Sequence, residues 1–426
     1  MVVNVSRRGN DEMPDEGRSG AVTCAKSESA TSKVLQVSIP RSGSNAVARM
    51  MEQSPSVAAV LRGRAMERGG SGFGAAIAEL QAQRPDRLPY IKELAAYLGD
   101  EQIALFDRDD RFLVVVRDPA QQVASTVLGV LRNPGPMRQR LAEVRGREVS
   151  EQELRDYLDA QAGTSFSDWS ELIGYVRRTH DFQPIGPTLS ELFDAQPDRD
   201  DCDDGLEWFD RSLFQVGTQS WSRAVELLAR LRDMGAERVT VVDFTVLQTR
   251  PELAAAVCDR LDLEFHPRMT DGGWDPASRW FTSGLELSDG DLWVGKAARS
   301  RSLERPLSIP YDPLTLVPPA SDAFLAGLGD YLRVLADPAL VWPRTAADVE
   351  QVLHSPAWRR DGTGYAPDEH HTTFTTKHPV SAWCLATAVL GPSCASAQAV
   401  EAANPHLAEF FAVARGIAES ATTVSC

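Results

Sequence analysis

The sequence predicts an α/β fold: a doubly wound parallel sheet flanked by helices, with a helical insertion and a C-terminal, mostly helical extension. Three short apolar segments, at residues 34–39, 112–116 and 238–243, have the length and β-branched content of buried strands. Each is followed by a segment with the apolar spacing of a helix. Strands that alternate with helices favour right-handed crossovers, and therefore a parallel sheet covered by helices.

The first strand, residues 34–39, ends in a short polar turn before a helix that is predicted at about residues 45–53. After Pro40, the turn consists of Arg41, Ser42, Gly43, Ser44 and Asn45. A strand–turn–helix join of this kind points backbone N–H groups and a helix N-terminus at one place, which suits a phosphate or a sulfate. The alternative is an ordinary turn rich in Ser and Gly.

Residues 73–98 are predicted to form a helix, a turn near Arg84-Pro85 and a second helix. The stretch 90–98 is compatible with a strand as well as with a helix. Lys92 and Glu93 lie in it. On a helix they would form an ordinary surface pair.

The second strand, residues 112–116, has a charged residue at its carboxyl end. Arg117 follows the strand directly, and Asp118 can cap the helix predicted at residues 119–131. Ser125 lies on the second turn of this helix, so it can converge with Arg117 on one anion. Alternatively, Arg117 pairs with a carboxylate and Ser125 has no particular role.

The rest of the α/β domain, predicted to span residues 33–340, contains one insertion and the third strand. The insertion covers about residues 134–215 and is mostly helical or loop. The third strand, 238–243, and a helix at 251–261 complete the parallel pattern. Two further helices are indicated by apolar stripes that should pack against the sheet: Trp221, Val225, Leu228 and Leu231 in one, and Phe324, Leu328, Leu332 and Leu335 in the other.

The chain ends are predicted to lie outside this domain. Residues 1–32 are polar and charged and are expected to be a disordered leader. Residues 341–426 are expected to form a helical extension, with Ala-rich helical patterns at 381–390 and 397–419. This extension is expected to form either a cap over the active site or a homodimer contact.

A polar loop in the extension contains three histidines and two acidic residues that invite a metal interpretation: Asp368, Glu369, His370, His371 and His378. Their spacing fits no known metal-site pattern, and neighbouring side chains in a loop rarely all face one ion. We therefore expect a solvated loop and no metal.

The two strand-end motifs together resemble the PAPS-dependent sulfotransferases, which transfer a sulfuryl group from 3′-phosphoadenylyl sulfate (PAPS). In that family a Pro-Lys/Arg-Ser-Gly-Ser/Thr loop binds the 5′-phosphosulfate. An Arg-(Asp/Asn)-Pro motif, with a Ser eight residues after its Arg, binds the 3′-phosphate. Residues 40–44 resemble the first motif, and Arg117-Asp118-Pro119 with Ser125 resembles the second. The family usually has Thr or Ser where this chain has Asn45, whose amide can also donate to a phosphate oxygen.

The resemblance covers about residues 33–335 and implies a P-loop-type fold. It also implies a PAPS site formed by the loop residues Arg41, Ser42, Gly43, Ser44 and Asn45, together with Arg117 and Ser125. Residues 238–265 are similar to the family's late strand, turn and helix, with Asp243 at its acidic position.

The resemblance also assigns residues to the chemistry. In the family a catalytic base follows a Lys on a short strand between the two motifs, and Lys92 and Glu93 occupy that interval. Lys92 matches the family's catalytic lysine and Glu93 is the candidate base, while Arg41 and the loop amides would stabilise the charge that grows on the leaving phosphate. His180 and Asp243 are weaker candidates for the base. Acceptor specificity would lie in the insertion.

Composition restricts the partners. The net charge of −16 argues against nucleic acids, anionic polysaccharides and anionic membranes, because each requires a basic surface. No apolar segment approaches the roughly 20 residues that cross a bilayer. The six cysteines are scattered, which fits a reducing cytoplasm better than a disulfide framework.

The leading hypothesis is therefore a cytoplasmic sulfotransferase that uses PAPS, requires no metal and acts on a hydroxyl or an amine of a small-molecule or carrier-held acceptor. Sulfate could remain in the product or serve as a leaving group in a later step. One alternative is a P-loop nucleotide kinase or NTPase, although the chain has no G-x-x-x-x-G-K-[ST] sequence. The other is a nucleotide-binding protein of the same fold that lacks catalytic activity.

Overall fold

The computed structural model describes a set of segments that includes all of the predicted strands. They are residues 32–39, 42–62, 72–95, 98–122, 138, 141–143, 145–162, 165, 213–270, 322–341, 345–353, 358–361, 364–367 and 379–423. Nearly all of the leader, much of the insertion and the histidine-containing loop lie outside these segments.

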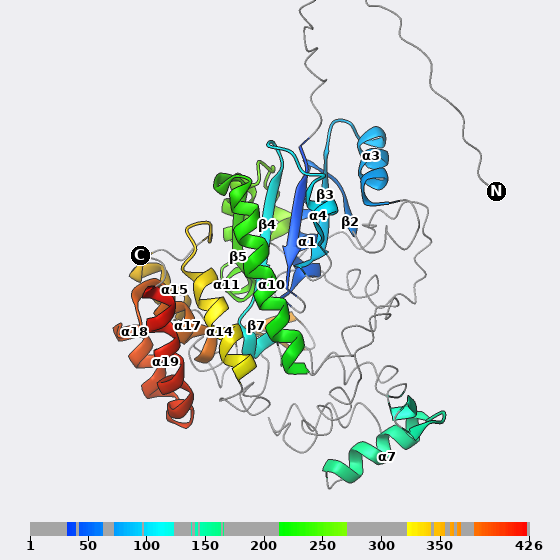
Figure 1. The fold of residues 1–426 in the computed structure, drawn as a ribbon. Helices are drawn as coiled ribbons and strands as arrows, with labels where there is room; N and C mark the ends of the chain where they lie inside the picture. The colour runs from blue at the N-terminus through cyan, green and yellow to red at the C-terminus, as the bar shows by residue number, and fades with distance from the viewer. Residues whose placement is uncertain are drawn as a thin grey trace, which may run out of the picture.

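The core of the fold is a five-stranded sheet in which every pairing is parallel. Its strands run in the order β2-β3-β1-β4-β5. The strands are β1 (Val34–Ser38), β2 (Val57–Arg62), β3 (Leu88–Leu94), β4 (Arg111–Val116) and β5 (Val239–Asp243). A parallel sheet flanked by helices confirms the predicted α/β class (Figure 1).

Two parts of the sheet differ from the sequence-based prediction. The expected second helix within residues 73–98 is wrong, because Leu88–Leu94 forms strand β3. All seven residues of β3 are buried, and a strand covered on both faces loses the alternation that identifies strands in a sequence. Strand β2 was not predicted, since its Ala-rich sequence has weak β-propensity.

Helices cover both faces of the sheet. On one face α1 (Ser44–Met51), α11 (Phe244–Thr249) and α12 (Leu253–Arg260) pack against the alternate strand residues Val34, Tyr90, Leu113, Val115 and Val242. The opposite face carries α3 (Phe73–Gln83), α10 (Leu213–Asp233) and α14 (Asp322–Leu335). The predicted stripes on α10 and α14 do belong to this core, with Val225 only partly buried.

The C-terminal helices continue the same apolar core. They are α15 (Ala346–Leu353), α17 (Pro379–Leu390), α18 (Ala395–Ala403) and α19 (Ala408–Thr423). Helix α14 lies between α10 and this group, since it packs on α10, α17 and α19 (Figure 1). The single helix predicted at 397–419 is interrupted at Asn404 and Pro405, because proline removes a helix donor and restricts the residue before it.

The remaining described elements are short or peripheral. They are α4 (Asp100–Ile103), α7 (Glu151–Ala162), the hairpin of β6 (Trp358–Asp361) and β7 (Gly364–Pro367), and three 3-10 turns at Ala236–Arg238, Pro267–Met269 and Pro405–Leu407. Within the described segments, no helix has the length and apolar character that a bilayer span requires.

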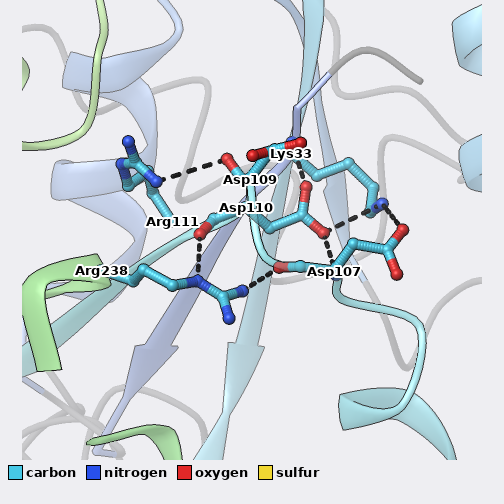
Figure 2. Close-up of polar contacts among 6 residues, drawn as sticks. All are labelled: Lys33, Asp107, Asp109, Asp110, Arg111 and Arg238. Atoms are coloured by element: carbon cyan, nitrogen blue, oxygen red, sulfur yellow. Dashed lines mark hydrogen bonds and ion pairs between the residues drawn. The ribbon is translucent and has the colours of Figure 1, made fainter. Parts of the chain in front are cut away.

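A buried ionic network closes the amino ends of β1, β4 and β5 (Figure 2). Asp110, 1% exposed, lies 3.0 Å from the Lys33 Nζ and accepts hydrogen bonds from the backbone N–H groups of Lys33 and Asp107 at 2.7 and 2.6 Å. Arg238 donates to the backbone carbonyls of Asp110 and Asp107 from the start of β5. This network holds together the amino ends of three strands, at the edge of the sheet opposite the carboxyl ends.

Candidate functional site

The strand order places a candidate site at the carboxyl ends of β1 and β4. The chain leaves β1 toward β2 on one side of the sheet, and it leaves β4 toward β5 on the other side. In doubly wound sheets the crevice between strands whose connections diverge in this way is the usual position of a ligand. The polar turn after β1 and the Arg117 segment after β4 both lie at this position.

The described part of the turn after β1, from Ser42 onward, is tied to the end of that strand. The Ile39 carbonyl accepts hydrogen bonds from both the backbone N–H and the hydroxyl of Ser42, at 3.2 and 2.7 Å. Gly43 then has a φ of 80°, in the left-handed region that glycine adopts without strain, and helix α1 begins at Ser44. The first turn of α1 therefore directs its N–H groups toward the carboxyl edge of the sheet.

A buried glutamine on β1 ties the start of α1 to the sheet. The Gln36 Nε2 donates to the Ser44 carbonyl at 2.9 Å and to the Ser38 hydroxyl at 2.8 Å. The Tyr90 hydroxyl donates to the Gln36 Oε1 at 2.8 Å, which fixes the orientation of the amide. Gln36 was not among the predicted site residues, although a polar residue inside an apolar strand was a usable signal.

Phe244 connects the turn to Arg117. A Cβ placed on Gly43 would lie 2.4 Å from atoms of the Phe244 ring, so only glycine allows the turn to approach that ring. The centre of the Arg117 guanidinium lies 5.7 Å from the centroid of the same ring, within the range of a cation–π contact. The two segments predicted to share a site are thus brought together around one aromatic side chain, for which the sequence held no local signal.

The orientation of Arg117 is fixed by the first turn of the following helix. The Arg117 Nε and Nη2 both donate to the Gln121 Oε1, at 3.1 and 2.8 Å. Asp118 caps that turn as predicted, since its Oδ1 accepts from the Gln121 backbone N–H at 2.9 Å. The predicted helix is described through Gln122.

Lys92 and Glu93 are both buried at the end of β3, each 4% exposed, so the surface-pair alternative is wrong. Successive side chains of a strand point to opposite faces. Lys92 is the register partner of Gln36, which places it on the α1 side of the sheet. Glu93 is the partner of Val37 on the other side, and its Oε1 accepts from the Leu94 backbone N–H at 2.8 Å.

Asn45 lies in the first turn of α1, and its side-chain oxygen is buried without a hydrogen-bond partner among the described residues. Arg41, Ser125 and His180 lie outside the described segments, as do the acidic residues and histidines of the C-terminal polar loop. Within the described segments no group of three or more His, Cys, Asp or Glu side chains is arranged to hold a metal ion.

Asp243, the weaker candidate for the base, is buried at the carboxyl end of β5. Its Oδ1 caps helix α11 by accepting from the Val246 backbone N–H at 2.9 Å, and its Oδ2 accepts from the Tyr331 hydroxyl at 2.8 Å. Burial raises the pKa of this carboxyl to about 6, although these hydrogen bonds oppose the shift. Its contacts are those of a structural cap between β5 and α14.

We expect Asp243→Asn to flatten the pH dependence of the unfolding free energy between about pH 4 and pH 6. Over this interval the folded protein holds the Asp243 proton more firmly than the unfolded chain, because its folded pKa of about 6 exceeds the ordinary 3.8. The contribution of Asp243 to stability therefore falls as the pH rises, by about 3 kcal/mol in total from well below the unfolded pKa to well above the folded pKa, and by about 2 kcal/mol between pH 4 and pH 6, at 1.36 kcal/mol per pKa unit. Urea denaturation across this range measures the difference between wild type and variant.

Asparagine can still cap α11 and carries no charge to desolvate, so Asp243→Asn should exceed the wild type in stability above pH 6. Asp243→Ala is the comparison, since it removes the cap and should be less stable at neutral pH. A constant stability difference between wild type and Asp243→Asn from pH 4 to 7 would contradict the assignment.

Comparisons of the chain with protein-family models, with curated proteins and with solved structures found no match.

Proposed function

We propose that the protein is a PAPS-dependent sulfotransferase with a P-loop-type fold, acting in the cytoplasm on a hydroxyl or an amine of a small-molecule or carrier-held acceptor. The observation that carries the proposal is the contact of Phe244 with both Gly43 and Arg117. It brings together the segments that resemble the 5′-phosphosulfate and 3′-phosphate motifs of that family.

The groups at this edge of the sheet fit a polyanionic nucleotide. The first turn of α1 provides backbone N–H donors and the positive end of a helix dipole. Arg117 adds a guanidinium, and Lys92 adds an ammonium on the same side of the sheet as α1. Positive groups of this kind can hold the two phosphorylated ends of one nucleotide.

The proposed chemistry requires an oriented acceptor, donors for the leaving phosphate and a base. When bound, PAPS supplies an activated sulfuryl group. Residues 42–45 and Lys92, with Arg41, would stabilise the growing charge on the leaving phosphate. Arg117, with Ser125, would hold the 3′-phosphate. Glu93, one residue before the end of β3, would accept the proton of the acceptor.

The proposal is tested by the effect of Arg117→Ala on nucleotide binding. Calorimetric titration with adenosine 3′,5′-bisphosphate should show a loss of about 1.5–3 kcal/mol, the value of a hydrogen bond to a charged group. Adenosine 5′-monophosphate, which has no 3′-phosphate, should bind both proteins equally.

Arg111→Ala is the matched control, because Arg111 lies at the amino end of the same strand and pairs with Asp262 on the surface. It should leave both affinities unchanged. Equal bisphosphate affinity of the wild type and Arg117→Ala would refute the role of Arg117. A wild type that binds the bisphosphate no better than the monophosphate would refute the proposed function.

A further inference from the structure

A buried chain of hydrogen bonds joins the C-terminal extension to Arg117. Ser381, on α17, donates from its hydroxyl to the Asp118 Oδ2 and accepts from the Gln121 Nε2 at 2.7 Å. The Gln121 Oε1 in turn accepts from the Arg117 Nε and Nη2 at 3.1 and 2.8 Å. Asp118, Gln121 and Ser381 are at most 3% exposed.

The chemistry of the two end groups fixes the direction of every bond in this chain. A guanidinium only donates, so the Gln121 atom that faces Arg117 must be the amide oxygen. The amide nitrogen then faces Ser381, which must accept from it. The Ser381 proton is thereby directed to Asp118, which has acceptor capacity for it.

The hydroxyl of Ser381 thus supplies the acceptor that the Gln121 nitrogen needs when its amide oxygen faces Arg117. Without this hydroxyl, the Gln121 nitrogen would lose a buried acceptor, and reversing the amide would place its N–H groups against the guanidinium. Either outcome disturbs the orientation of Arg117, because an unsatisfied buried polar group is costly.

We propose that Ser381 is a positioning residue through which the C-terminal extension orients Arg117 for the 3′-phosphate of the bound nucleotide. This inference rests on the proposed function, and it gives the extension a role in nucleotide selection. Helix α17 packs against α14, and Ser381 bonds Asp118 just beyond the carboxyl end of β4.

The test compares two nucleotides across variants of the full chain. Ser381→Ala should weaken binding of adenosine 3′,5′-bisphosphate by about tenfold, in line with the loss of one hydrogen bond to a charged group, and should leave binding of adenosine 5′-monophosphate unchanged. Gln121→Leu should show the same selective loss. Because Ser381 acts through Gln121, the double variant should be no worse than Gln121→Leu alone.

Thr387→Val is the matched control. Thr387 is buried on the same helix, and its hydroxyl has no hydrogen-bond partner among the described residues. Removing that hydroxyl should leave both affinities unchanged. The inference would be overturned if Ser381→Ala weakened the binding of both nucleotides equally. It would also be overturned if its loss of affinity added to that of Gln121→Leu, because either result would show a general structural role.

A further measurement separates the inference from the proposed function. In nucleotide-free protein, the losses of urea stability in Ser381→Ala and Gln121→Leu should be non-additive, since the two residues share a hydrogen bond. Additive losses would overturn the inference even if the bisphosphate were preferred. Non-additive losses in a protein that does not distinguish the two nucleotides would refute the function and leave the hydrogen-bond chain intact.

Discussion

Glu93→Gln is expected to slow sulfuryl transfer by about 10²–10⁴-fold, the usual contribution of a positioned general base. Glutamine has the same shape, and its Oε1 can still accept from the Leu94 backbone N–H, so the end of β3 should keep its structure. It cannot take up the acceptor proton. Mass spectrometry of reactions with PAPS and a panel of hydroxyl and amine acceptors measures the rate.

Binding of adenosine 3′,5′-bisphosphate to Glu93→Gln should equal that of the wild type, because the base acts on the acceptor. Glu79→Gln is the control, since it makes the same chemical change at an exposed position on α3. Turnover by Glu93→Gln at the wild-type rate would remove Glu93 as the base. Slower turnover accompanied by weaker nucleotide binding would instead indicate a disturbed site.

Asp110→Ala should lower the free energy of unfolding by about 3–5 kcal/mol, the range for breaking a buried ion pair from one side. The substitution leaves the Lys33 ammonium, whose side chain is 8% exposed, without its 3.0 Å partner. It also removes the acceptor of two backbone N–H groups, those of Lys33 and Asp107 (Figure 2). Urea denaturation followed by tryptophan fluorescence measures the loss.

Asp109→Ala is the control for this prediction. Asp109 is the exposed neighbour of Asp110. Its backbone carbonyl accepts a hydrogen bond from Arg111, and the Asp109→Ala variant keeps this carbonyl. Its stability should lie within about 0.5 kcal/mol of the wild type. A loss for Asp110→Ala no larger than that for Asp109→Ala would show that the network contributes little.

The sequence predicted strands most reliably where a continuous apolar pattern coincides with burial. The segments 34–39, 112–116 and 238–243 became β1, β4 and β5 with bounds shifted by one residue or less at each end. Continuous apolar runs bounded by polar residues are typical of strands covered on both faces. The sequence left β3 undecided between strand and helix because Lys92 and Glu93 break its apolar run, although both are buried.

The site was predictable only in part, because some of its residues stand in local motifs and others reach the site only through packing. Gly43 and Arg117 stand at strand ends, where sequence motifs are local and recognisable. Phe244 and Ser381 lie far from them in the chain, and only packing brings them to Gly43, Arg117 and Asp118.

The sequence by itself determined the α/β class, the polar turn after β1 and the charged end of β4, because strand pattern and turn chemistry depend on neighbouring residues. The tertiary structure decided the order of the strands, the faces to which Lys92 and Glu93 point and the connection of Ser381 to Arg117 through Gln121. These features depend on contacts between residues separated by up to 263 positions, and no local propensity specifies them.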